Sequence, residues 1–369
     1  MTSAATSPLQ FRIATPMNPG ALAVFDIIGE IESILPRLMR FRNGNTLHIP
    51  VGKIRLVHFL DVNGEIIDTG IVARPSSTLT QIMPHGGLRI VHKLVETLVT
   101  LGANPITTDD WSPDLWPEAE SFVEALMLET LAAARSVDAV DLLLTQPTRW
   151  QSYYDDETKR YRVSASEWDL LQRRSHILKR LITPPMVVIT GPANTGKSTL
   201  TNALTGRSTS ITLDQPGTTR DFVGSFIDLA GLTVSWFDTP GLRRTDDVIE
   251  RQALQLSQPI IDNADLIIEA RSPDVSPDTY FEHDSTQRPC DLQVMLKADL
   301  IPTLKNTMRD HSNDRGSVST SLAISAQTGE GIEEFVRIIR ERFVPKEVYD
   351  EPLPFIFDDR MLSMIDIAQ

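Results

Sequence analysis

Cysteine and long apolar runs are scarce in this sequence. Cys290 is the only cysteine, which excludes an internal disulfide and a metal site built from cysteines alone. No stretch reaches the roughly 18 consecutive apolar residues that a membrane-spanning helix needs. The first residues, MTSAATSPLQF, lack the basic start and apolar run of a signal peptide. We therefore expect a cytoplasmic protein that is not inserted in a membrane.

Basic residues are also in deficit, and the formal net charge is −14. Proteins that bind nucleic acid through many phosphates are usually basic. Any RNA contact would therefore need a local patch, and the candidate is the cluster Arg173, Arg174, Lys179 and Arg180. The alternative is that these side chains form a solvated helix face.

The length of 369 residues suggests two or three domains, at roughly 100–200 residues per domain. Hydrophobic residues make up 41% of the chain, which is enough for packed cores. The predicted divisions are an α+β domain (1–104), a helical region (105–183), an α/β domain (184–345) and a C-terminal tail (346–369).

The first two divisions differ in their hydrophobic period. Short apolar runs separated by turn signals such as Asn63-Gly64 predict strands, and a helical pattern then ends on Gly102. In the second division, residues 118–144 predict a long helix, broken at most once, with Pro117 in its first turn. Residues 166–181 predict another helix, which two prolines stop.

Strands and helices alternate in the third division. This order is typical of a mostly parallel sheet covered on both faces. The predicted strands are 186–190, 222–229, 232–237, 264–270, 292–296 and 321–325, and the predicted helices are 198–205, 247–262 and 331–342.

Residues 191–198 read GPANTGKS, between a predicted strand and a predicted helix. This context is the one that a phosphate-binding loop requires. Gly191 and Gly196 let the backbone curl so that its N–H groups cradle phosphates. Lys197 reaches the outer phosphates and the Ser198 hydroxyl binds Mg²⁺. The loop residues predicted to bind nucleotide are Asn194, Thr195, Gly196, Lys197, Ser198 and Thr199.

Further elements follow in the order that a nucleotide hydrolase needs. Thr219, in PGTTRD, supplies a second hydroxyl to Mg²⁺. Asp238 ends a predicted strand and is the expected acidic partner of Mg²⁺. The N–H of Gly241 meets the γ-phosphate. Because ligands of such sheets bind at the carboxyl ends of the strands, chance does not explain this series.

The base is predicted to be guanine. Asp299 can accept hydrogen bonds from both N1–H and the exocyclic amine of guanine, a donor pair that adenine lacks. The stem of Lys297 covers the ring, and Ser325 and Ala326 complete the pocket, with the Ala326 N–H on O6. Leu296 stands where the usual NKxD sequence has asparagine, so we expect guanine preference with weakened affinity.

Several segments resemble the MnmE/TrmE tRNA-modification GTPases. In the α/β domain they are Asn194, PGTTRD (216–221), DTPGLR (238–243) and Glu250-Arg251. Near the N-terminus they are IATP (13–16), NGEIIDTG (63–70) and HGG (85–87). The resemblance implies a Ras-like P-loop GTPase domain preceded by an α+β folate-binding-like domain that holds a homodimer. A tRNA or a tRNA-modifying protein is the partner that it implies.

The resemblance also implies roles for particular residues. Asn194 would help to bind K⁺, whose charge replaces that of an arginine finger. Leu242 cannot orient water as a glutamine does, and Glu250 matches the family's water-positioning glutamate. The alternative is that Glu250 is a solvent-facing carboxylate on the next helix.

The chain departs from the family in other places. Asp26 and Gln81 stand where the family has a folate-binding arginine and glutamate, so folate binding is predicted to be lost. His85 is then expected to be a turn or packing residue. The family's C-terminal reactive cysteine motif is absent, and Cys290 lies inside the GTPase domain. We therefore expect a shortened, divergent relative that lacks the C-terminal helical half.

Three functions remain open from the sequence. The first is a GTPase that hydrolyses GTP to GDP and phosphate, with Lys197, Thr219 and Glu250 as catalytic residues. The second is a nucleotide-gated scaffold with negligible turnover, which Leu242 and Leu296 favour. The third is a GTPase of the ribosome-assembly type.

Overall fold

The computed structural model describes residues 9–15, 20–41, 48–106, 115–206, 211–212, 224–239, 259–276, 288–301, 309–312 and 318–368. The chain divides into two compact units, Met1–Leu128 and Glu129–Gln369. This division falls within helix α3 (Phe122–Leu131), whereas the four sequence-based domains stay a prediction. Among the described residues, no helix combines the length and the apolar character that crossing a membrane requires.

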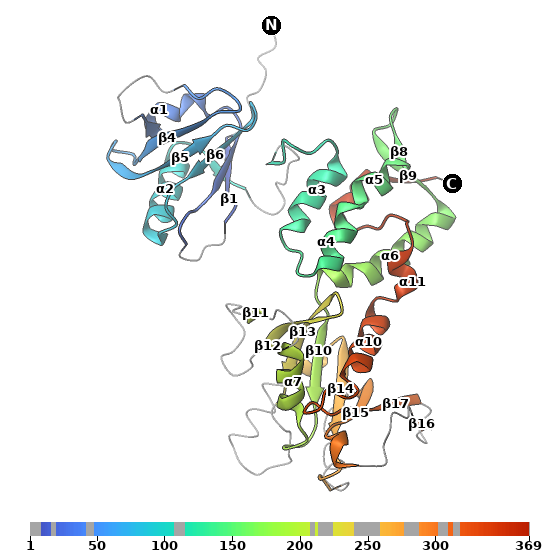
Figure 1. The fold of residues 1–369 in the computed structure, drawn as a ribbon. Coiled ribbons are helices and arrows are strands. Elements are labelled where there is room, and N and C mark those ends of the chain that lie inside the picture. Colours follow the sequence, from blue (N-terminus) through green and yellow to red (C-terminus); the bar gives the residue numbers. More distant parts are fainter. Residues whose placement is uncertain are drawn as a thin grey trace. The chain divides into compact units, whose positions relative to one another are not determined.

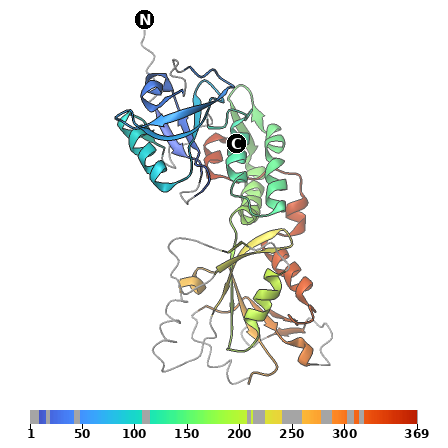
Figure 2. The same cartoon turned by 60° about the vertical axis from the view of Figure 1, so that its left-hand side comes forward.

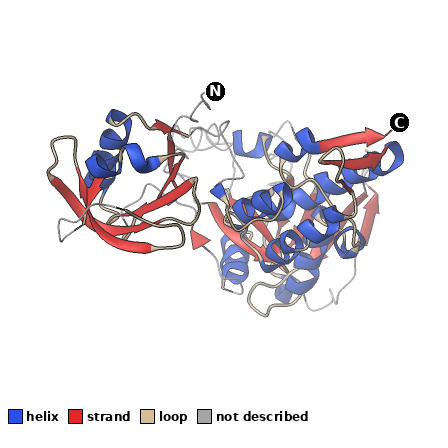
Figure 3. Ribbon diagram, turned by 90° about the horizontal axis from the view of Figure 1, so that it is seen from above, coloured by secondary structure: helices blue, strands red, loops and turns tan. Residues whose placement is uncertain are grey.

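A mostly antiparallel seven-stranded sheet, in the order β3-β4-β5-β6-β2-β1-β7, belongs to the first unit. Its strands are among those drawn as red arrows in Figure 3. Its strands are β1 (Gln10–Ile13), β2 (Phe25–Ile28), β3 (Met39–Arg40), β4 (Ile54–Leu60), β5 (Ile66–Ala73), β6 (Leu79–Met83) and β7 (Asn104–Pro105). Its short helices are η1 (Ile31–Ser33) and α1 (Leu35–Leu38), and its long helix is α2 (Leu88–Thr100). The predicted α+β pattern is confirmed, and Gly102 follows α2 at φ +93°, which glycine tolerates best.

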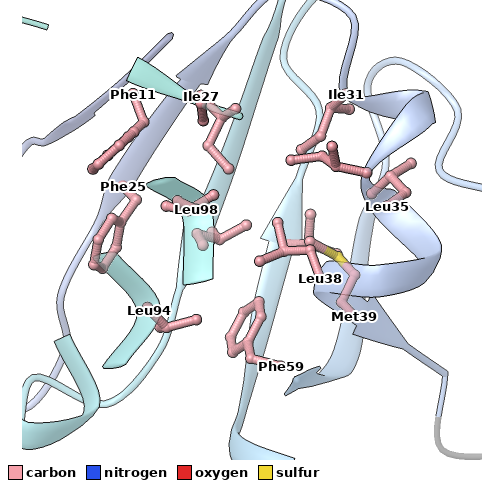
Figure 4. Packing of buried hydrophobic residues seen from close by; sticks show 14 of the residues in the cluster. Phe11, Phe25, Ile27, Ile31, Leu35, Leu38, Met39, Phe59, Leu94 and Leu98 are labelled. Carbon is pink, nitrogen blue, oxygen red and sulfur yellow. The ribbon is translucent and has the colours of Figure 1, made fainter. Parts of the chain in front are cut away.

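One face of this sheet carries the core of the unit. Alternate residues of a strand point to opposite faces, so Phe25 and Phe59 face inward toward Leu94 and Leu98 of α2 (Figure 4). All of these side chains are fully buried. The opposite face is not uniform, because it carries buried Ile28 of β2 as well as the exposed apolar residues Leu56 and Ile71 of β4 and β5.

The second unit begins with helices. They are α4 (Val137–Leu144), α5 (Gln146–Gln151) and α6 (Ala165–Ile182). The predicted long helix is broken once, between α3 and α4, where Ser136 accepts a hydrogen bond from the Ala139 N–H and caps α4. The expectation for Pro117 is wrong, because α3 begins only at Phe122.

The C-terminal segment returns to these helices (Figures 1 and 2). It contains α11 (Lys346–Asp350), η5 (Asp359–Met364) and β18 (Ile365–Ala368). Strand β18 joins β9 (Arg160–Ser164) and β8 (Tyr154–Asp155) in a three-stranded sheet that the sequence does not predict. The indole N–H of Trp150 donates to the Phe355 carbonyl (3.2 Å), and Gln146 accepts from the Phe355 N–H (3.1 Å). The segment predicted as a tail is therefore part of the packed structure.

An eight-stranded sheet follows, in the order β11-β12-β13-β10-β14-β15-β17-β16 (Figure 1). Its strands are β10 (Met186–Thr190), β11 (Ile211–Thr212), β12 (Gly224–Leu229), β13 (Leu232–Asp238), β14 (Leu266–Arg271), β15 (Leu292–Met295), β16 (Arg309–Ser312) and β17 (Val318–Ala323). The central strands β13, β10, β14, β15 and β17 pair in parallel, which confirms the predicted sheet.

Helices cover both faces of this sheet. Trp236 of β13 donates to the Thr201 hydroxyl of α7 (Lys197–Thr205; 3.0 Å) and meets Phe335 of α10 (Ile332–Phe343) edge-on. The next residue, Phe237, packs on the other face against a cluster that includes Ile261. Only the end of the helix predicted at 247–262 lies within the described residues.

Candidate nucleotide-binding site

The loop between β10 and α7 has a backbone that only particular residues allow. Gly191 has φ +139°, and a Cβ at this position would clash with the carbonyl oxygen of Ala270 on β14. Gly196 has φ +101° and directly precedes α7. Asn194 also has positive φ (+65°), a conformation that asparagine tolerates better than most residues. The loop thus has the curled shape that its sequence predicts for phosphate binding.

Lys197 lies at the centre of this loop. Its side chain is buried, with 6% of the residue exposed, and its ammonium donates to the carbonyl oxygens of Gly191 and Pro192 (both 2.9 Å). Burial lowers the pKa of Lys197, whereas the nearby Asp238 carboxylate opposes this change. The hydroxyl of buried Thr195 donates to the same Pro192 oxygen (3.0 Å). The loop therefore holds one desolvated positive charge where phosphates are expected.

Ser198 and Asp238 form a candidate magnesium site. Strands β10 and β13 run in parallel, so the end of β13 places Asp238 beside the first turn of α7. The Ser198 hydroxyl donates to Asp238 Oδ2 (2.7 Å), and buried Asp238 Oδ1 has no hydrogen-bond partner within the described residues. Burial raises the pKa of Asp238, and the Ser198 hydrogen bond and Lys197 oppose that rise.

The donor set fits Mg²⁺. This ion is usually held in phosphate sites by one or two carboxylates, with hydroxyl, water and phosphate oxygens completing the octahedron. A buried carboxylate oxygen without a partner carries a desolvation cost that a bound cation would relieve. The described part of the chain contains no group of three His, Cys, Asp or Glu residues that could bind a metal without phosphate.

The predicted base-binding residues come together at the ends of β15 and β17. Ser325 is fully buried, and its hydroxyl donates to Asp299 Oδ1 (2.6 Å). The backbone N–H of Ala298 donates to the Ile324 carbonyl (3.1 Å), which joins the two loops. Ala326 is half-buried beside Ser325. This arrangement leaves the Asp299 carboxylate exposed and able to accept from a base.

Lys297 connects the base end to the phosphate loop. Its ammonium donates to the Asn194 carbonyl (2.6 Å) and to Asp274 Oδ2 (2.7 Å), and the Ser272 hydroxyl donates to the other oxygen of Asp274. Ser272 and Asp274 are not among the residues that the sequence predicts for the site. The available signal was their position directly after β14, at the same edge of the sheet as the other site residues. Leu296 is buried beside Gly196.

Other predicted residues lie outside the described residues. They are Thr219, Gly241, Leu242 and Glu250. Within the described part, Asn194, Ser198 and Thr199 are exposed at the loop. Their predicted roles in binding K⁺, Mg²⁺ or nucleotide stay predictions.

The first unit holds the residues that were compared with a folate site. Asp26 is buried on β2, where Oδ2 accepts from Arg12 Nε (2.8 Å) and Oδ1 accepts from Gln81 Nε2 (2.9 Å). Both carboxylate oxygens therefore already have partners inside the protein. The backbone N–H of His85 donates to Asp68, and its ring nitrogen Nδ1 also contacts that carboxylate (2.9 Å), as expected for a residue that fixes a turn.

The proposed basic patch is largely engaged within the chain. Arg174 is buried and donates to backbone carbonyls of Val348 and Glu351. Lys179 pairs with Asp359 (2.5 Å) and Arg180 with Asp265 (3.0 Å). Arg174 is therefore a buried structural residue, and of the four only Arg173 is exposed.

The site defines the class of protein: a P-loop GTPase. The model of the 50S ribosome-binding GTPase family matches residues 186–297, from β10 to the base-binding Lys297. Among solved structures, Era in complex with MgGDPNP and part of 16S ribosomal RNA is 26% identical, with 44% of this chain and 57% of that chain covered and a TM-score of 0.36. The G domain of the Thermotoga maritima FeoB iron transporter is 22% identical, with 42% and 97% covered and a TM-score of 0.34.

Curated relatives extend the similarity over most of the chain. The tRNA modification GTPase MnmE of Acidiphilium cryptum is 30% identical over 324 residues, which are 77% of this chain and 71% of the relative. MnmE of Bacillus pumilus is 25% identical over 405 residues, covering 97% and 87%. The chain belongs to the MnmE family of tRNA modification GTPases.

Proposed function

We propose that this GTPase hydrolyses GTP to GDP and phosphate at the site formed by Lys197, Ser198 and Asp238. The observation that supports the proposal best is the Ser198–Asp238 hydrogen bond beside the buried Lys197 ammonium. Lys197 would bind the outer phosphates, and Ser198, Asp238 and Thr219 would hold Mg²⁺. When bound, Mg²⁺ neutralises the charge that develops on the phosphate oxygens.

The nucleotide is proposed to bind from the phosphate loop to Ala326. Thr195, Gly196, Thr199 and the Gly241 N–H would contact phosphates. Asp299 would accept from guanine, with the Lys297 stem over the ring and Ser325 holding Asp299, as their 2.6 Å hydrogen bond suggests. If ATP displaced bound GDP as well as GTP does, this base assignment would be wrong.

Asn194 is proposed to bind K⁺, and Glu250 to position water. The positive φ of Asn194 turns the loop at this point, which is compatible with a cation beside the phosphates. The test is steady-state GTP hydrolysis in KCl and in NaCl at equal ionic strength, with an Asn194→Ala variant. Stimulation by K⁺ that is lost in the variant supports the assignment. GTP binding without turnover in either salt would favour the nucleotide-gated scaffold.

A second copy of the chain is the proposed partner of the first unit. Ile54, Leu56 and Ile71 are exposed by 64%, 50% and 36%, and Leu56 lies directly opposite Ile71 on β4 and β5. These side chains share the sheet face away from the core, and exposed apolar patches mark interfaces. Leu56→Asp should shift a dimer to monomers in analytical ultracentrifugation. Val99→Asp, at an equally exposed apolar residue of α2, should not; a monomeric parent would refute the proposal.

The helical part is proposed to transmit nucleotide-dependent movements. Arg340 of α10 pairs with Asp138 of α4 (3.0 Å) and donates to the Ala230 carbonyl in the turn between β12 and β13 (3.3 Å). This turn joins β12 and β13, and those strands border residues 217–224 and 241–250, which are proposed to be the switch segments that the γ-phosphate orders. Hydrogen exchange of α4 should differ between the GTP-bound and GDP-bound protein, and equal exchange would exclude the coupling.

A role in tRNA modification in the cytoplasm is proposed from the family alone. The relatives are called tRNA modification GTPases, and binding of tRNA, or of a tRNA-modifying protein, to the purified chain is the direct test. The description of the matching family model favours a second candidate, a ribosome-binding role. Co-sedimentation with 50S particles but not with tRNA would favour that candidate.

Folate is proposed not to bind to the first unit. Asp26 carries the wrong charge for an anionic folate, and its oxygens are occupied by Arg12 and Gln81. Calorimetry that shows micromolar binding of formyl-tetrahydrofolate would contradict this proposal.

A further inference from the structure

Asp274 stands at the meeting point of three loops. It follows β14, its Oδ2 accepts from Lys297 after β15, and Lys297 in turn donates to Asn194 in the phosphate loop. The Ser272 hydroxyl holds the other oxygen of Asp274. A continuous chain of hydrogen bonds therefore runs from the end of β14 through Lys297 to the phosphate loop.

The hydrogen bonds of Lys297 matter because Leu296 cannot connect the base loop to the phosphate loop through its side chain. At the position where NKxD sequences have asparagine, Leu296 has no side-chain donor or acceptor, and it is 2% exposed beside Gly196. Its backbone N–H donates to Arg271 (2.7 Å), so the backbone is tied to β14. The side-chain connection between the base loop and the phosphate loop is made instead by Lys297, from a backbone with φ +55°.

We propose that Asp274 is a positioning residue for guanine-nucleotide binding, which holds the Lys297 side chain over the purine ring and against the phosphate loop. It takes the place of the hydrogen-bonding side chain that Leu296 lacks. The inference rests on the proposed placement of the base beside Lys297 and Asp299.

Lys297 and Asp299 contact different parts of the base, so their contributions to nucleotide affinity can be measured separately. Lys297 covers the face of the ring, which guanine and hypoxanthine share, whereas Asp299 recognises the exocyclic amine that only guanine has. Loss of Asp274 should therefore weaken GDP and IDP equally. The hydrogen bond to Lys297 also keeps the pKa of Asp274 low, so the carboxylate is ionised at neutral pH. Since Lys297 and Asp274 are 30% and 46% exposed, salt should screen their attraction.

The test is equilibrium binding of GDP and IDP by the full chain at low and high salt. Asp274→Asn should weaken both nucleotides about 3-fold to 10-fold in low salt, and by less in high salt. Asp274→Glu should restore affinity to within about twofold, because it keeps the charge. The matched control is Glu334→Gln, which removes the exposed Glu334–Arg337 ion pair of α10 and should change neither affinity. Unchanged affinity in Asp274→Asn would overturn the inference.

A double-mutant cycle shows whether Asp274 acts through Lys297. Lys297→Gln should weaken binding, and adding Asp274→Asn to it should cause no further loss. Additive losses would mean that Asp274 acts elsewhere and would overturn the inference. If the parent chain binds GDP but Lys297→Gln has no effect, the proposed base site itself is wrong, which distinguishes the two failures.

Discussion

Two lysines donate to the phosphate loop, and their surroundings differ. Lys197 is 6% exposed and bonds to Gly191 and Pro192, whereas the Lys297 side chain is 30% exposed and bonds to Asn194 and Asp274. Charge interactions strengthen as water is excluded, and salt screens exposed pairs far more than buried ones. The phosphate end should therefore dominate affinity and turnover, and the base end should mainly decide which base is accepted.

The largest expected effect is at the buried lysine. Lys197→Ala should lower GTP hydrolysis by at least about 100-fold, because it removes the charge nearest to the reacting phosphate. Steady-state turnover measures the change, and circular dichroism checks the fold. Lys179→Ala, which removes a surface partner of Asp359, is the control and should change turnover by less than about twofold. Turnover that survives Lys197→Ala would place the chemistry elsewhere.

A substitution at the base end should change which nucleotide base the protein prefers. Asp299→Asn should weaken GDP binding by about 100-fold, because the buried donors of guanine lose an ionised acceptor. The same variant should gain affinity for XDP, since the amide can donate to the C2 carbonyl of xanthine. Competition binding with GDP, XDP and ADP measures both changes. A uniform loss for all three nucleotides would instead indicate a damaged fold.

The carboxylate at the phosphate end combines a functional role with a cost in stability. Asp238→Asn should abolish stimulation of hydrolysis by Mg²⁺. It should also raise the melting temperature in EDTA by about 2–4 °C, because an amide is cheaper to desolvate than the carboxylate oxygen that has no partner among the described residues. Thermal melts with and without Mg²⁺ measure the two effects. The control is Asp366→Asn, which removes a half-exposed carboxylate paired with Arg160 and should leave the stimulation by Mg²⁺ unchanged. A lower melting temperature for Asp238→Asn in EDTA would refute the argument.

The difference between the surroundings of Lys197 and Lys297 also shows which parts of the structure can be predicted from the sequence. The phosphate loop is a local motif. The backbone conformation around Gly191, Gly196 and Lys197 can therefore be predicted from a few consecutive residues. The parallel sheet follows from periodicity and strand ends. In contrast, the Lys297–Asp274 contact depends on where β14 ends and on the positive φ of Lys297, neither of which a periodicity shows.

Strand pairing between segments far apart in the chain is the second feature that the sequence does not predict. Strand β18 pairs with β9, whose residues lie about 200 positions earlier, and no local signal identifies that partner. The short β8–β9 hairpin was likewise hidden in a region of helical pattern. The ion pair of Asp26 with Arg12 was not predicted either, because it depends on the antiparallel pairing of β1 with β2, which no local signal in the sequence specifies.

Substitution of Leu296 should change nucleotide affinity least, and it tests directly whether Lys297 and Asp274 connect the base end to the phosphate loop. If Asp274 already ties the base end to the phosphate loop, Leu296→Asn should improve GDP affinity by less than about threefold in the parent chain. In Asp274→Asn the same substitution should recover more, because the loop then lacks its side-chain connection. The buried position should make Leu296→Asn less stable by about 1–3 kcal/mol, which denaturant unfolding measures. Equal gains in both backgrounds would mean that the asparagine and Asp274 act independently, and that the exposed lysine contributes less to the phosphate loop than its contacts indicate.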